Sequence, residues 1–279
     1  MPRVSARPSE ILLLGLTFFL ALANVYPIYQ MVMASVEPFG RLLQSPALGL
    51  PTEMTLENYA EVLTRGPIPH FFINSLIVAT GTMLLSTALA VLAGYSLARL
   101  KYPGKSVIDK TILFVYIIPP VLLVVPLYVL FVQLNLQNNY LGLVLAHTLF
   151  AVPFGSWLLR GFFRSIPIEL EEAARVDGAG RLTALARVVL PVSAPGVSAV
   201  ALFAFVGSWG EFLFASVFIN SADMNTLPIG IYSLVSSYGE TQWGNLLAAS
   251  TIATLPMFVI FLILQRWLVQ GLTAGAVKA

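Results

Sequence analysis

The chain lacks cysteine altogether and carries little charge. The absence of cysteine excludes a disulfide framework, a CxxC redox site and thiolate metal ligands. Only 10% of the 279 residues are charged, whereas soluble domains carry roughly 25%. Hydrophobic residues make up 58%, mean hydropathy is +0.85, and the net charge of +2 is too small to indicate nucleic acid as a partner. These values indicate a polytopic membrane protein.

Catalytic signatures are missing as well. The sequence contains neither an HExxH nor a GxSxG pattern, and it offers no nucleophile paired with a base. Residues 104–106, Gly-Lys-Ser, resemble the end of a phosphate-binding loop, but Arg99 stands where that motif requires its first glycine. We therefore expect a turn here, no ATP or other cofactor bound by this chain, and no enzymatic activity.

Six segments are long and apolar enough to cross a bilayer, which requires roughly 20 residues. All are expected to be helical, because a backbone in lipid must satisfy its own hydrogen bonds. The sequence thus predicts an all-α membrane protein of one domain, residues 1–279. The predicted spans are residues 11–35, 71–96, 111–134, 140–163, 191–219 and 245–269.

The orientation follows from the positive charges. Thirteen of the 15 Lys and Arg residues lie at the two termini or in the connections between spans two and three and between spans four and five. Only Arg41 and Arg65 lie on the other side. Because positive charge marks the cytoplasmic side, both termini are expected in the cytoplasm. Arg3 and Arg7 before an apolar run resemble a signal peptide, but the run continues to about residue 35, which favours an uncleaved first helix.

A polar island, residues 160–191, interrupts the apolar sequence and holds nine charged residues. Pro167 suits the start of a short helix, and Gly178 suits its end, because glycine readily adopts the left-handed conformation. A second helical stretch, residues 181–189, leads to Pro191. The island is therefore expected to form a helix–turn–helix that contacts a soluble partner; an amphipathic helix resting on the membrane is the alternative.

The spacing within this island resembles the signature loop of ABC importer permeases. Glu172-Ala173-Ala174 is followed by three residues, Gly178, nine residues, an aliphatic residue, one further residue and Leu190-Pro191. Residues 208–215 and the C-terminal residues 266–278 resemble the smaller permease subunit of maltose-type carbohydrate importers. At one position, Gly210, the sequence departs from the asparagine usual in that family.

The resemblance implies partners and contact residues. In that family a second permease, an ATPase dimer that binds ATP and magnesium, and an extracytoplasmic solute-binding protein complete the complex in a bacterial or archaeal inner membrane. Residues 165–190 would form the coupling loop and residues 270–279 a cytoplasmic tail. Residues implied to contact the ATPase are Glu171, Glu172, Ala173, Ala174, Asp177 and Gly178 in the loop, and Gly271, Leu272 and Thr273 in the tail.

Within the spans, Glu211 is the one acidic residue, and an intramembrane carboxylate indicates a function by default. With Trp209 and Gly210, it is assigned to the solute path or to a contact with the partner permease; a structural hydrogen bond that fixes the fifth helix is the alternative. For Asn74 and His147, interhelical hydrogen bonds are expected rather than solute contacts.

The expected function is that of a permease subunit that couples ATP hydrolysis in a partner to alternating access, importing a sugar such as a disaccharide or oligosaccharide. The same fold importing a glycerol-phosphate ester is an alternative. A stand-alone secondary transporter is another, although it would carry internal repeats and several intramembrane charges.

Overall fold

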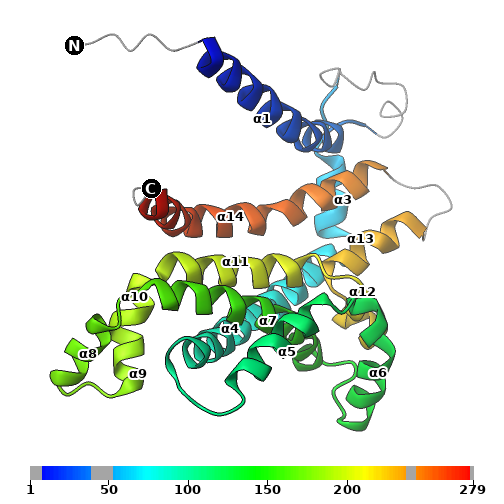
Figure 1. The fold of residues 1–279 in the computed structure, drawn as a ribbon. Coiled ribbons are helices and arrows are strands. Elements are labelled where there is room, and N and C mark those ends of the chain that lie inside the picture. The colour runs from blue at the N-terminus through cyan, green and yellow to red at the C-terminus, as the bar shows by residue number, and fades with distance from the viewer. Residues whose placement is uncertain (1–7, 39–52, 237–242, 277–279) are drawn as a thin grey trace. The chain divides into compact units, whose positions relative to one another are not determined.

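The computed structural model describes residues 8–38, 53–236 and 243–276, and this part of the chain is helical, with no β-strand (Figure 1). The prediction of an all-α fold is confirmed. Four helices are long and apolar enough to cross a membrane. They are α1 (Pro8–Ser35), α4 (Ile68–Arg99), α7 (Tyr140–Ser165) and α14 (Trp243–Ala276).

The predicted third span, residues 111–134, is not one straight helix. It consists of α5 (Lys105–Ile117) and α6 (Pro120–Gln133), which meet at 103°. The break lies at Ile118, whose ψ of 122° is extended, because the residue before a proline avoids the helical conformation. Pro120 then starts α6, where its missing N–H costs nothing.

The predicted fifth span, residues 191–219, is also interrupted. Arg181–Val192 and Ala194–Trp209 meet at 85°, so that six spans result if each bent pair counts as one. The first arm contains α9 (Arg181–Ala184), the π-helix η1 (Leu185–Val189) and α10 (Leu190–Val192). The second arm is α11 (Ala194–Trp209), and a further break precedes α12 (Leu213–Phe218).

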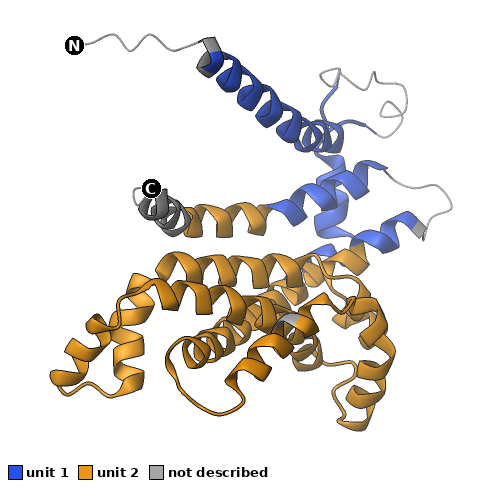
Figure 2. Ribbon diagram, in the orientation of Figure 1, with its two compact units in different colours: residues 1–69, 231–254 blue, residues 70–230, 255–279 orange. Residues whose placement is uncertain are grey.

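The chain divides into two compact units, residues 1–69 with 231–254 and residues 70–230 with 255–279 (Figure 2). In the first unit, α3 (Glu57–Thr64) is fastened to the end of α1. The Asn58 amide donates to the carbonyls of Ser35 (2.9 Å) and Glu37 (3.0 Å), and the hydroxyls of Ser35 and Tyr59 lie 2.6 Å apart.

The second unit contains the apolar core around α7. Towards one end, Phe131, Leu143, Phe214 and Phe218 pack with Val78 of α4. Towards the other, a second buried cluster reaches the polar island through η1; its members include Ala90, Tyr95, Leu159, Phe163, Leu185, Val189 and Val200. Because this cluster joins η1 to α4, α7 and α11, the island is anchored to these three helices.

Connections near the first of these clusters are held by asparagine side chains. Asn138 accepts bonds from the N–H groups of Asn220 and Ser221, both at 3.0 Å. The Asn74 amide donates to the carbonyls of Asp223 and Asn225, both at 2.8 Å, so Asn74 bonds within the protein but to a connecting segment rather than to a second span. These bonds fix the segment around η2 (Ala222–Met224), which precedes α13 (Leu227–Ser236).

Gly155 allows a close approach of α7 to α4 and α11. A Cβ added there would lie 2.8 Å from Val200 of α11 and 2.9 Å from Ala90 of α4. We expect Gly155→Leu to lower the thermal unfolding midpoint of the detergent-solubilised chain, because overpacking a filled core costs about 1–3 kcal/mol. Gly161→Leu is the matched control in the same helix, since nothing lies within 4 Å of its Cβ position. Equal midpoints for the two variants would contradict this packing.

Candidate functional site

The polar island folds into a short helix with a defined end. The helix α8 (Glu169–Val176) stops at Gly178, which has a φ of +87°. Its N–H bonds to the carbonyl of Arg175 (3.1 Å), and the N–H of Ala179 bonds to that of Ala174 (3.0 Å). The predicted left-handed stop at Gly178 is confirmed, and the chain turns there into α9.

One side of α8 is buried and holds a charged anchor. The Glu171 side chain forms an ion pair with the Arg99 guanidinium, and the side chains are only 7% and 11% exposed. The Tyr95 hydroxyl donates to the second Glu171 oxygen at 2.9 Å. Arg99 also donates to the Ile166 carbonyl at 2.7 Å. The polar helix is thereby fixed to the end of α4 and to the residue that follows α7.

The placement of Glu171 differs from the sequence interpretation, which grouped it with the residues that contact a partner. Its carboxylate points inward, so the structure gives it an anchoring position. Arg99 and Tyr95, which complete the anchor, were missed by the sequence interpretation. The sequence held two signals for this anchor. Arg99 directly follows a predicted span, and Glu171 and Ala174 are three residues apart, which places these two on one side of a helix.

The opposite side of α8 is exposed. Glu172, Ala173, Asp177 and Gly178 are all exposed, and Ala174 is half-buried. Two apolar side chains that the sequence interpretation did not single out are also exposed on this surface. Val176 of α8 is 87% exposed, and Leu182 of α9 is 70% exposed. An apolar residue four positions after Glu172 in a polar island was the signal for Val176.

A second polar group lies within the apolar core, at the break between α11 and α12. Both Glu211 oxygens accept bonds from the start of α12, from the N–H of Phe214 (2.8 Å) and of Ala215 (3.1 Å). His147 of α7 lies with Nε2 3.1 Å from Glu211 and Nδ1 2.7 Å from the Ser208 hydroxyl. Ser208 in turn lies 3.2 Å from the Thr82 hydroxyl of α4.

This network shows which bonds the intramembrane residues make. The interhelical bonding expected for His147 is confirmed. Glu211 makes structural hydrogen bonds, and its assignment to the solute path or to a partner contact stays a prediction. Trp209 is buried (5% exposed) and stacks on Phe205 with ring centroids 5.7 Å apart, whereas Gly210 is exposed at the break. Of the three residues grouped in the sequence, Glu211 alone lines the adjacent cavity.

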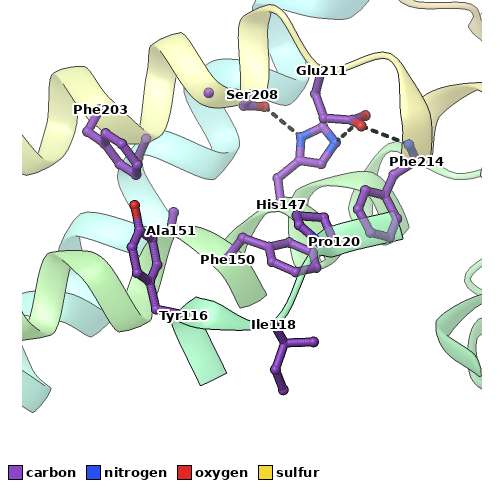
Figure 3. Close-up of a pocket in the computed structure, with 12 residues that line it drawn as sticks. Tyr116, Ile118, Pro120, His147, Phe150, Ala151, Phe203, Ser208, Glu211 and Phe214 are labelled. Atoms are coloured by element: carbon purple, nitrogen blue, oxygen red, sulfur yellow. Dashed lines mark hydrogen bonds and ion pairs between the residues drawn. The ribbon is translucent and has the colours of Figure 1, made fainter. Parts of the chain in front are cut away.

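The cavity has a volume of about 300 Å³ and lies between the α5–α6 bend, α7 and the α11–α12 break. Figure 3 shows Glu211, His147 and Ser208 together at one end, with the rings of Tyr116 and Phe203 at the other. Phe150 and Phe214 supply further aromatic surface. The cavity thus combines a small cluster of polar groups with an aromatic wall, a composition typical of small-molecule sites.

Two further expectations concern metals and the tail. Within the described ranges, no group of three or more His, Asp or Glu side chains could hold a metal ion.

The helix α14 extends to Ala276, but the side chains of Gly271, Leu272 and Thr273 lie outside the described residues. Their implied contact with an ATPase stays a prediction.

Comparison with known proteins extends the likeness over most of the chain. The chain is 33% identical over 271 residues to the trehalose/maltose transport system permease protein MalG of Thermococcus litoralis, covering 96% of this chain and 97% of that protein. It is 32% identical over 266 residues to the inner membrane ABC transporter permease protein YcjP of Escherichia coli (strain K12), covering 95% and 94%.

A solved structure shares the fold. A chain of a bacterial ABC transporter involved in the import of the acidic polysaccharide alginate has a TM-score of 0.81 and 20% identity, covering 95% of this chain and 98% of that one. Residues 86–274 also match the model of one family, described as the inner membrane component of binding-protein-dependent transport systems. This chain therefore belongs to the family of binding-protein-dependent transport system inner membrane components.

Proposed function

We propose that the chain is one of two permease subunits of an ATP-driven importer and that its solute is a sugar. The observation that carries this proposal is α8, whose inner carboxylate is fixed to α4 while its outer side is exposed. The sequence holds no complete phosphate-binding loop, so ATP hydrolysis belongs to partner subunits. The family membership supplies the dependence on a binding protein.

The outer side of α8 is suited to bind the ATPase. Ala173 has no long side chain, so that a partner can approach the helix backbone closely, and Glu172 beside it offers a charge for a basic group. Val176 and Leu182 add exposed apolar surface, which gains free energy when a partner covers it. With 13 of the 15 Lys and Arg residues on the side of the polar island, this surface faces the cytoplasm.

The inner side of α8 supports transmission of movement. Because Arg99 holds both Glu171 and the Ile166 carbonyl, a displacement of α8 by the ATPase also displaces the end of α4. The breaks at Ile118 and at Ser193 allow the two arms of each bent span to tilt separately. In this mechanism, closure of the ATPases on ATP turns the permease pair outward, and hydrolysis resets it inward.

The solute and the remaining partner follow from the relatives. MalG is a permease of a trehalose/maltose system, and the solved neighbour belongs to a transporter that imports alginate, a polysaccharide. A sugar is therefore the solute class that we assign to this chain. The segment held by Asn74 and Asn138, on the side opposite α8, is the surface we assign to the binding protein.

The proposal is tested by purifying the chain from its native membrane through an N-terminal tag, which leaves residues 270–279 free. We expect a second permease and an ATPase to co-purify, and ATP hydrolysis by the purified complex to rise when the binding protein is added with its solute. A chain that purifies alone and still moves solute without ATP would establish a secondary carrier instead.

A further inference from the structure

We propose that the cavity beside Glu211 binds one uncharged sugar ring, whose hydroxyl groups bond to Glu211 and Ser208 while a C–H face stacks on Phe203. This inference rests on the proposed function and deepens it, because it places a solute contact on this chain and excludes anionic solutes from that contact. It also gives Glu211 a second role beside the structural one.

The hydrogen-bonding capacity of the polar end determines what it can bind. A carboxylate has about four acceptor positions, and Glu211 uses three, with Phe214 N–H, Ala215 N–H and His147. A hydroxyl has one donor and two acceptor positions. Ser208 donates its proton to the Thr82 hydroxyl and therefore accepts from His147 Nδ1. The free position on Ser208 is thus an acceptor, like the one on Glu211.

Acceptor positions require a ligand that donates. Sugar hydroxyls donate, and a hydroxyl that donates to a carboxylate forms one of the stronger types of hydrogen bond. Phosphate, sulfonate and carboxylate groups offer oxygens that only accept, and they would meet the negative charge of Glu211. No Lys or Arg lines the cavity. The polar end therefore disfavours a glycerol-phosphate ester or an acidic saccharide.

The opposite wall and the size agree with one ring. Phe203 is 40% exposed and its ring centroid lies 4.3 Å from that of Phe154, while Tyr116 stacks on Phe154 at 5.6 Å. Phe154 thus supports the rings of Phe203 and Tyr116, both of which line the cavity. Pyranose rings carry patches of C–H groups that pack on the face of such an aromatic ring. A volume of about 300 Å³ lies at the small end of ligand sites, which suits one ring of a longer saccharide.

The absence of native cysteine allows a direct test by thiol labelling. Gly207 lines the cavity and nothing lies within 4 Å of its Cβ position, so Gly207→Cys introduces a thiol there without a clash. Gly161→Cys, equally free of close neighbours but outside this cavity, is the matched control. Both are prepared in the full complex in native membrane vesicles. Labelling of this chain by a cationic and an anionic methanethiosulfonate is measured by mass spectrometry.

Two results are expected for Gly207→Cys. Replacing Glu211 by Gln in the same chain slows cationic labelling and speeds anionic labelling by about five-fold each, since a nearby charge contributes about 1 kcal/mol even in water. The ratio of the two rates therefore falls by about 25-fold. Maltose or trehalose slows labelling of Gly207→Cys and leaves Gly161→Cys unaffected, whereas an alginate trisaccharide protects neither. In the Phe203→Ala background, the sugar concentration for half-protection rises about ten-fold, because one aromatic contact is lost.

The inference is overturned if the charge ratio is unchanged by Glu211→Gln, if neither neutral disaccharide protects, or if the alginate trisaccharide protects as well. These failures are distinct from failure of the proposed function. A complex that assembles with its ATPase but shows no protection retains the importer function and loses the cavity site. If no ATPase assembles, the charge ratio and the protection by sugar are still measured on this chain in the membrane.

Discussion

Glu172→Lys is expected to release the ATPase from the purified complex and to abolish solute uptake. Glu172 lies on the exposed side of α8, so the substitution leaves the packing of the chain intact. It reverses the charge that we assign to a basic group of the ATPase. Truncating one partner of a buried, hydrogen-bonded charge pair at an interface costs about 2–5 kcal/mol, which corresponds to about 30-fold or more in affinity.

The measurement is the amount of ATPase that co-purifies with the tagged chain. Glu172→Gln, which removes the charge without reversing it, is expected to give an intermediate amount. Glu57→Lys makes the same charge change at another exposed helical position, in the first turn of α3, and is expected to retain the ATPase fully. Full retention of the ATPase by Glu172→Lys would show that this side of α8 is not the docking surface.

Arg99→Leu is expected to leave the ATPase bound but to reduce uptake at least ten-fold. The substitution removes the cation from a buried ion pair and leaves the Glu171 carboxylate uncompensated, which typically costs about 3–5 kcal/mol. The outer side of α8 remains available, whereas its link to α4 is lost. ATP hydrolysis should therefore continue without productive movement of the spans. Uptake per ATP hydrolysed, measured in proteoliposomes, reports this loss of coupling.

Two further variants separate the anchor from a general loss of stability. Arg99→Leu combined with Glu171→Leu removes both charges, and we expect it to recover part of the uptake, because an apolar pair replaces a buried ion pair at little cost. Tyr95→Phe removes the single 2.9 Å bond to Glu171 and should produce a milder defect. Normal coupling in Arg99→Leu, or a double variant as poor as the sum of the two single ones, would refute the anchoring role.

Local pattern predicted those features that depend on a few neighbouring residues. The long apolar runs predicted helices because only a helix satisfies the backbone in lipid. Gly178 predicted the end of α8, since its left-handed conformation suits glycine. The expected interhelical bond of His147 followed from the same reasoning about unsatisfied polar groups among apolar ones.

The bends could not be located from composition. Hydropathy averaged over a span is unaffected by a change in direction, so residues 111–134 were predicted as one helix although Pro119 and Pro120 lie within them. At the further break, after Trp209, the Glu211 carboxylate bonds to the start of α12. Its third partner, His147, lies 64 positions earlier in the sequence, so only the tertiary structure shows the pair.

The sequence also does not show which side of α8 is buried, because that depends on residues distant in the sequence. Glu169, Glu171 and Glu172 are equivalent by residue type, and an eight-residue helix gives little periodicity from which to orient it. The distinction arises from Arg99 and Tyr95 of α4, which lie 72 and 76 positions before Glu171 in the sequence. Sequence reasoning thus identified the helix that we assign to docking, whereas its division into a buried and an exposed side required the tertiary structure.

The central claim is that this chain moves its solute only when a bound ATPase hydrolyses ATP. The most direct measurement is uptake into proteoliposomes of the solute carried by the binding protein, with the complete complex and with ATP or a non-hydrolysable analogue on the side where α8 lies. We expect uptake with ATP and binding protein together, and none with the analogue or with Glu172→Lys. Uptake that proceeds equally without ATP would contradict the account and identify a carrier driven by a gradient.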